Sequence, residues 1–179
     1  MRLFSFLVLS AAILLTSGCA SLSKEECLSG NWKQIGYNDG ARGGDASSNL
    51  RSHSKSCAEH GIGINRDAYY AGHKDGLKKF CTPANGRRHG EQGFHYGGIC
   101  PAELESAFLK QYTYGKKIHD AVQEYNQTKR DIYEKEKALE KEADARIREI
   151  LRSEIATMDK LLRSQQREID RLNDNAPPY

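Results

Sequence analysis

Three side chains that could bind a metal ion follow one another at helical spacing. His53, Cys57 and His60 fall at positions i, i+4 and i+7, so a helix would place them on one face. Imidazole and thiolate are ligands for zinc or copper, and His73 or His89 could complete a set of four. A metal ligand must be a free thiolate, whereas features at the N-terminus, described below, predict export to an oxidising compartment. We therefore expect Cys57 to form a disulfide and the chain to hold no metal and no other cofactor.

Two Asp-Gly pairs are the best candidates for acid–base chemistry. Asp39 and Asp75 each precede a glycine, and paired carboxylates could serve as acid and base. We favour a role in turns or helix caps, where such pairs are common. The basic stretch from Gly86 to Gly90 lacks the Lys-Ser/Thr signature of a phosphate-binding loop. Since Gly-x-Ser-x-Gly, His-Glu-x-x-His and Cys-x-x-Cys motifs are also missing from the sequence, we expect no catalytic residues and no enzyme.

Cys19 is the residue with the clearest chemical context, because it ends the run Leu15-Thr16-Ser17-Gly18-Cys19 behind Arg2 and an apolar stretch. That stretch is shorter than the roughly 20 residues of a membrane-spanning helix, and small residues before a cysteine suit a signal peptidase. We predict a lipoprotein signal peptide over residues 1–18, lipidation of Cys19 and a tether over 19–26. An ordinary cleaved signal or a signal anchor is the alternative. Ala20 in place of an aspartate favours the periplasmic face of the outer membrane.

Four further cysteines remain after Cys19, and an even number in an exported chain indicates disulfides. They are Cys27, Cys57, Cys81 and Cys100. Three connectivities exist, and we favour Cys27 with Cys57 and Cys81 with Cys100, because an antiparallel pair formed by residues 31–43 and 47–60 would return Cys57 to Cys27.

Residues 27–100 are expected to form a small disulfide-stabilised module that is mainly α-helical. An aromatic residue precedes glycines spaced by four, as in Trp32…Gly36…Gly40 and Tyr69…Gly72…Gly76. On a helix these glycines share one face, and each costs about 1 kcal/mol relative to alanine, so the repetition predicts close approach of another backbone. Hairpin turns at the Asp-Gly pairs are the alternative.

Residues 101–174 are expected to form one long helix, because no glycine or proline interrupts 116–176 and strong helix formers dominate. At 1.5 Å per residue it would extend roughly 105 Å. Apolar residues at spacings of three and four form two registers, joined by a stutter near Ala143. This pattern fits either a solitary projecting helix or a coiled coil with a partner or a second copy. Residues 175–179, which contain two prolines, are expected to be frayed.

The order of cysteines, glycines and aromatic residues over about 22–120 resembles the Gram-negative lipoprotein family known as domain of unknown function 2799. The residues that carry the resemblance are Cys27, Gly30, Asn31, Trp32, Ile35, Gly36, Asp39, Gly40, Gly43, His53, Cys57, Gly61, Tyr69, Gly72, Gly76, Leu77, Cys81, Pro83, Asn85, Gly86, Gly90, Gly93, Tyr96, Cys100 and Pro101. Asn31 stands where an acidic residue is common in that pattern. The resemblance implies an envelope lipoprotein and carries no catalytic residues.

Together these features predict a structural or partner-binding protein of the cell envelope, held at the membrane by its lipid. A side-chain balance of 26 basic against 24 acidic residues after removal of Arg2 with the signal predicts no nucleic-acid partner. The alternative function is a small-ligand or glycan-binding module with an aromatic groove of Trp32, Tyr37, Tyr69, Tyr70 and Tyr96. A cell-wall hydrolase is the third.

Overall fold

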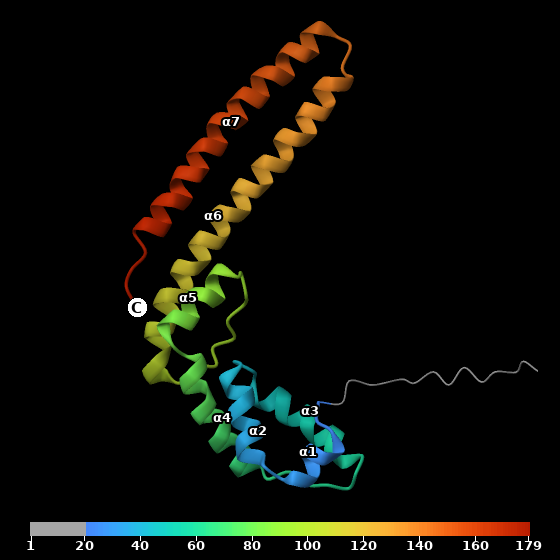
Figure 1. Ribbon diagram of the computed structural model, residues 1–179, viewed down its shortest axis with the longest axis vertical. Coiled ribbons are helices and arrows are strands. Elements are labelled where there is room, and N and C mark those ends of the chain that lie inside the picture. Colours follow the sequence, from blue (N-terminus) through green and yellow to red (C-terminus); the bar gives the residue numbers. More distant parts are fainter. Residues whose placement is uncertain (1–20) are drawn as a thin grey trace, which may run out of the picture.

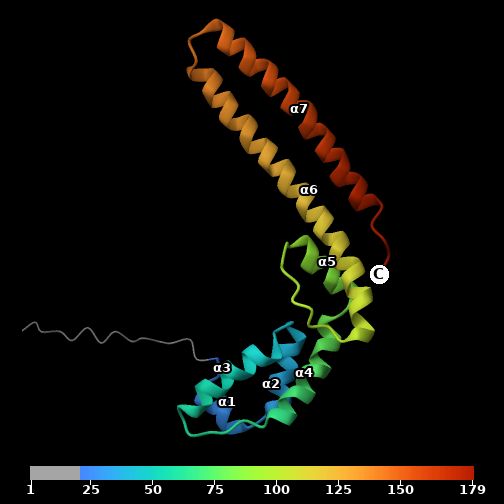
Figure 2. The same cartoon turned by 180° about the vertical axis from the view of Figure 1, so that it is seen from behind.

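The computed structural model describes residues 21–179, and within this range the chain folds into seven helices without a strand (Figures 1 and 2). The helices are α1 Lys24–Ser29, α2 Trp32–Ala41, α3 Ala46–Ala58, α4 Arg66–Phe80, α5 Pro83–Glu91, α6 Ala102–Lys141 and α7 Ala145–Asp174. The expected mainly α-helical fold is thus confirmed. Cys19 and the predicted signal peptide lie outside the described residues.

Helices α2 and α4 cross at their glycines. Gly36 and Gly40 lie against the backbone of Tyr69 and His73, and a methyl group on either glycine would overlap a carbonyl oxygen of α4. Gly72 and Gly76 lie against α2 in the same way. Residue numbers rise together along both helices, so α2 and α4 run parallel. The predicted close crossing of short helices is confirmed here, and the turn alternative is wrong.

Helices α5 and α6 repeat this arrangement. Gly86 and Gly90 of α5 lie against the backbone of Phe108 and Tyr112 of α6, while Gly115 lies against Arg87. A parallel, glycine-lined crossing therefore occurs twice along the chain. Figure 1 shows the second pair stacked above the first, with α4 leading from one to the other.

The two disulfides join the predicted partners. Cys27 bonds Cys57, which ties α1 to α3, and Cys81 bonds Cys100, which ties the start of α5 to the start of α6. Each disulfide belongs to one apolar core. The first core also contains Leu22, Trp32, Leu50 and Tyr69, and the second also contains Leu77, Phe80 and Phe108.

Residues 102–174 form two helices instead of the expected single one, and α7 returns alongside α6 as a hairpin (Figures 1 and 2). The chain leaves the helix at Glu142, and Asp144 caps α7 by accepting hydrogen bonds from the backbone N–H groups of Arg146 and Ile147. Arg148 donates to the carbonyl oxygens of Leu139 and Glu142 at the end of α6. The Asp144 cap and the hydrogen bonds of Arg148 therefore stabilise the turn, although it contains neither glycine nor proline.

Each helix of the hairpin is the other's partner, so the contact that the apolar registers predict lies within the chain. Two bonds between the helices set the antiparallel alignment. Lys135 Nζ lies 2.6 Å from Glu154 Oε2, and Tyr114 Oη donates to the carbonyl oxygen of Leu172 at 2.6 Å. With 40 residues, α6 extends about 60 Å, so the folded hairpin reaches much less far than one continuous helix would.

The segment after α7 also differs from expectation. Residues 176–179 pack against α5 and α6 through hydrogen bonds to the carbonyl oxygens of Pro177 and Pro178, where we expected a frayed end. Across residues 21–179, no helix combines the length and apolar character needed to span a membrane.

Candidate functional site

A buried aspartate lies at the centre of the first helix pair. Asp39 of α2 is 4% exposed, and its Oδ2 lies 2.8 Å from His53 Nε2 of α3 and accepts a hydrogen bond from Tyr69 Oη of α4 at 2.8 Å. Arg42 donates to Oδ1 at 2.8 Å from the solvent side. Donors from α3, from α4 and from the residue after α2 thus surround one carboxylate, and the glycines of α2 and α4 bring these two helices close together.

This environment favours the ionised form of Asp39. Burial is the largest single influence and opposes the charge, but hydrogen bonds from His53, Tyr69 and Arg42 outweigh it, so the pKa of Asp39 is below its usual value. Burial, together with hydrogen bonding to Asp39, raises the pKa of Tyr69, which keeps the phenol protonated. A carboxylate only accepts hydrogen bonds, so we assign the hydrogen to His53 Nε2.

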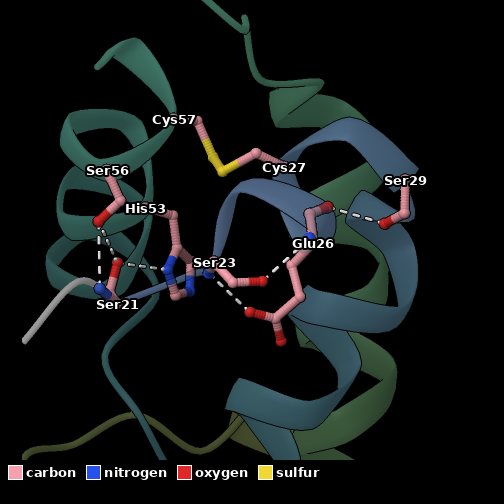
Figure 3. The surroundings of a disulfide bond; sticks show 8 residues. All are labelled: Ser21, Ser23, Glu26, Cys27, Ser29, His53, Ser56 and Cys57. Carbon is pink, nitrogen blue, oxygen red and sulfur yellow. Dashed lines mark hydrogen bonds between the residues drawn. A yellow bond between two sulfur atoms is a disulfide. The ribbon is translucent and has the colours of Figure 1, made fainter. Parts of the chain in front are cut away.

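The first described residues of the chain join this cluster beside the Cys27–Cys57 disulfide (Figure 3). Ser21 Oγ lies 2.9 Å from His53 Nδ1, and the Ser21 N–H donates to Ser56 Oγ at 3.1 Å. The position expected to carry the lipid, Cys19, is only two residues earlier in the sequence. The first described residue after Cys19 is therefore bonded directly to α3.

Ser21, His53 and Asp39 form a hydrogen-bonded series in the order found in Ser–His–Asp hydrolases. An open pocket of about 240 Å³ adjoins them, also lined by Glu26, Asn38 and Arg42. Ser21 Oγ is also within 3.2 Å of Ser56 Oγ, so its hydroxyl is shared between two partners. These hydrogen bonds fix Ser21 in place, and we assign Ser21 no catalytic step.

The other candidates are separated by the fold. Asp75 is exposed and pairs with Lys78 at 2.8 Å, so it does not join Asp39 in a carboxylate pair. Cys57 is bonded to Cys27, so it cannot act as a thiolate ligand beside His53 and His60. Within residues 21–179, no three His, Cys, Asp or Glu side chains converge as a metal site would require.

The aromatic groove suggested for ligand binding is not assembled as such. Trp32 and Tyr69 are 5% and 0% exposed and belong to the first core. Tyr70 is exposed, while Tyr37 and Tyr96 are half-buried. Two of the five rings in this set, including the single tryptophan, are thus unavailable to a ligand.

A second polar cluster lies in the α5–α6 pair, where sequence reasoning placed none. The Arg87 side chain is 6% exposed and donates from Nε to Gln111 Oε1 at 3.0 Å. The guanidinium lies over the Tyr114 ring, with its carbon 4.5 Å from the ring centroid, and the segment after α7 covers it. The only hint in the sequence was the basic stretch 86–90, because the partners are far away along the chain.

Fold and clusters together define a class of protein: a small, disulfide-stabilised helical module, built from two glycine-lined helix pairs and extended by a helical hairpin. Residues 31–117 match the family described as Protein of unknown function (DUF2799), which confirms the resemblance to domain of unknown function 2799 seen in the sequence. The match covers α2 to α5 and the first part of α6, and with them both glycine-lined crossings. Of the two polar clusters it leaves out only Ser21 and the residues after α7. No curated protein and no solved structure matches the chain.

Proposed function

We propose that this protein is a lipoprotein of the outer membrane that faces the periplasm and binds a protein partner through its α6–α7 hairpin. Cys19 would carry the lipid, and the hydrogen bonds of Ser21 to α3 would hold the anchored end against the body of the protein. Two disulfides support export to an oxidising compartment.

The observation that carries the partner-binding role is the width of the apolar face on α7. The positions of the second predicted register on α7 are buried or half-buried, and α7 packs against α6; they are Leu151, Ile155, Met158, Leu162, Gln165, Ile169 and Leu172. Ile147, Ile150 and Leu161 continue this face to one side and are 45%, 58% and 50% exposed. At about 100° per residue these three share one side of the helix. One partner helix, α6, therefore covers only part of the apolar face.

An additional helix laid along this side would bury all three residues. Ile147 and Ile150 lie three residues apart and Leu161 lies eleven residues further on, so this side has aliphatic side chains at two places, and such side chains are the usual anchors by which one helix binds another. The occupant that fits this face best is thus an amphipathic helix of a partner protein, and self-association of two hairpins is the competing outcome.

The test combines Ile150→Glu and Leu161→Glu in the full chain. Crosslinking in intact cells, followed by identification of copurifying proteins, should lose the main crosslinked partner, because two charges would be buried in the contact. Ala156→Glu is the matched control, since Ala156 is exposed on another side of α7. Light scattering of the purified parent chain distinguishes self-association from a separate partner.

Crosslinks that persist unchanged in the double variant would contradict the role of the hairpin. Metabolic palmitate labelling tests the anchor independently: Cys19→Ala should lose the label and leave the membrane fraction. Retention of label in Cys19→Ala would overturn the lipoprotein assignment while leaving the hairpin result intact.

A further inference from the structure

Arg87 is a buried cation without an acidic partner. Within residues 21–179 no carboxylate forms an ion pair with it. A guanidinium remains charged in proteins, and burying a charge is costly unless its hydrogen-bonding groups are satisfied. Part of that compensation comes from a neutral acceptor, Gln111 Oε1, and from the aromatic ring of Tyr114.

The remaining acceptor comes from the segment Ala176–Tyr179, called here the tail segment. Arg87 Nη2 donates to the carbonyl oxygen of Pro177 at 3.1 Å, and Gln111 Nε2 donates to that of Pro178 at 2.8 Å. The ring of Tyr179 lies on the guanidinium, with its centroid 5.8 Å from the central carbon. Two consecutive carbonyl oxygens and one ring are thus recognised.

The tail segment has the properties of a ligand. It forms no helix, and its two prolines limit it to an extended conformation before it binds, which lowers the entropy cost of binding. Pro178 and Tyr179 remain exposed, with Tyr179 76% exposed, so the tail segment lies on the surface as a bound peptide does. Recognition of proline-rich segments through carbonyl oxygens and aromatic rings is a recurrent mode of peptide binding.

We propose that Arg87, Gln111 and Tyr114 form a binding site for an extended Pro-Pro-aromatic peptide, which the chain's own tail segment occupies. Release of the tail segment frees the same donors for an equivalent segment from a second copy or from another protein. The bound tail segment competes with such a ligand, because its attachment to α7 keeps its effective concentration high. This inference does not depend on the partner-binding role proposed for the hairpin.

The test uses the full chain with its tail segment weakened by Pro178→Gly and Tyr179→Ala. A dye-labelled peptide of the sequence of residues 173–179 is titrated with this chain and with the parent, and fluorescence anisotropy measures binding. The weakened chain should bind the peptide at least about tenfold more tightly than the parent does, because its own tail competes poorly. Equal or absent binding to the two chains would overturn the proposal.

Gln111→Glu, added to the weakened chain, tests the site itself. Glutamate keeps an acceptor for Arg87 but replaces the Nε2 donor with an oxygen, so the Pro178 carbonyl is repelled while the fold is retained. Peptide affinity should fall about tenfold or more, the factor that corresponds to one hydrogen bond of this kind. Gln127→Glu is the matched control, because Gln127 lies exposed on the same helix and makes hydrogen bonds only to Arg130 and Asp131.

Equal affinities of the Gln111→Glu and Gln127→Glu chains, with unchanged circular dichroism, would contradict the assignment of the site. Light scattering of the parent chain then identifies the source of a competing segment. Concentration-dependent dimers that vanish when the tail segment is weakened indicate exchange between copies, and a monomer at all concentrations indicates a segment from another protein.

Discussion

The two parallel helix pairs, α2–α4 and α5–α6, cross in the same register but surround the crossing with different chemistry. Gly36 faces Tyr69 in the first pair as Gly86 faces Phe108 in the second. Around the first crossing lies the Asp39 network of hydrogen bonds, whereas rings of Phe80, His89, Tyr96 and Tyr112 surround Phe108 in the second. Glycine spacing therefore sets the backbone geometry, and the neighbouring side chains are free to differ.

The most consequential difference lies where α4 has Gly72 and the corresponding position of α6 has Gln111. Gly72 lies directly on the backbone of Lys33, so the first pair is closed at this level. Gln111 instead reaches Arg87 and the tail segment. At this level the first pair is therefore closed by backbone contact, whereas the second pair has a polar site.

Replacing Gly72 by alanine tests the closed crossing and has the largest expected effect. The new methyl group would overlap the carbonyl oxygen of Lys33, which cannot move independently of α2. Separating the helices should cost about 3 kcal/mol, partly offset by about 1 kcal/mol of helix propensity, so urea denaturation should show a net loss of about 2 kcal/mol. Gly115→Ala should behave alike, because its methyl group would overlap the carbonyl oxygen of Arg87.

Gly63→Ala is the control for that series, because no atom lies within 4 Å of the added group. Its stability should change by less than about 0.5 kcal/mol. If Gly72→Ala proved as stable as Gly63→Ala, the close contact between α2 and α4 at Gly72 would be contradicted.

Exchanging the matched aromatic residues tests the difference in chemistry. Tyr69→Phe removes a donor from Asp39, and Phe108→Tyr adds a hydroxyl to a fully buried ring, so each change should cost about 1.5 kcal/mol. The pKa of Asp39 should also rise in Tyr69→Phe. Tyr133→Phe, at an exposed position of α6, should be nearly neutral in the same denaturation experiment. A neutral Phe108→Tyr would mean that the second crossing tolerates polar groups as the first does.

The smallest expected effect is the contribution of Asp39, in the first helix pair, to the pH dependence of the unfolding free energy. The folded-state pKa of Asp39 is lowered, so its stabilisation is present above its unfolded pKa of about 4 and is lost as the pH falls through the lower folded value. Asp39→Asn should therefore show a flatter fall in unfolding free energy between pH 5 and pH 2. Asp75→Asn is the control, since that exposed pair with Lys78 contributes little. Equal slopes for Asp39→Asn and the parent would contradict an ionised Asp39 in the folded protein.

Local spacing was sufficient to predict the helical module and its close crossings, whereas the favoured disulfide pairs depended on an assumed antiparallel arrangement of residues 31–43 and 47–60. Glycines four residues apart leave one helix face without side chains, and that property needs no knowledge of the partner. The break at residues 142–144 was missed because neither glycine nor proline marks it. The available signal was Asp144, a good N-cap residue shortly before the apolar Ile147.

The two polar clusters could not be predicted because their members come from distant segments. Asp39 was matched with Asp75 by their similar sequence contexts, yet its partners, His53 and Tyr69, come from helices 14 and 30 residues away. Sequence spacing identifies residues that share a face of one helix. It does not identify which faces of separate helices meet.

The hydrogen bond between Arg87 and Pro177 joins residues 90 positions apart in the sequence. Closing so long a loop costs more chain entropy than forming the α6–α7 hairpin from its three-residue turn, so the tail segment should dock after the hairpin has closed. The tail segment, which covers Arg87, is thus the last part of the fold to assemble. By the same reasoning it is the part of the fold that can open first while both disulfides and both helix pairs remain intact.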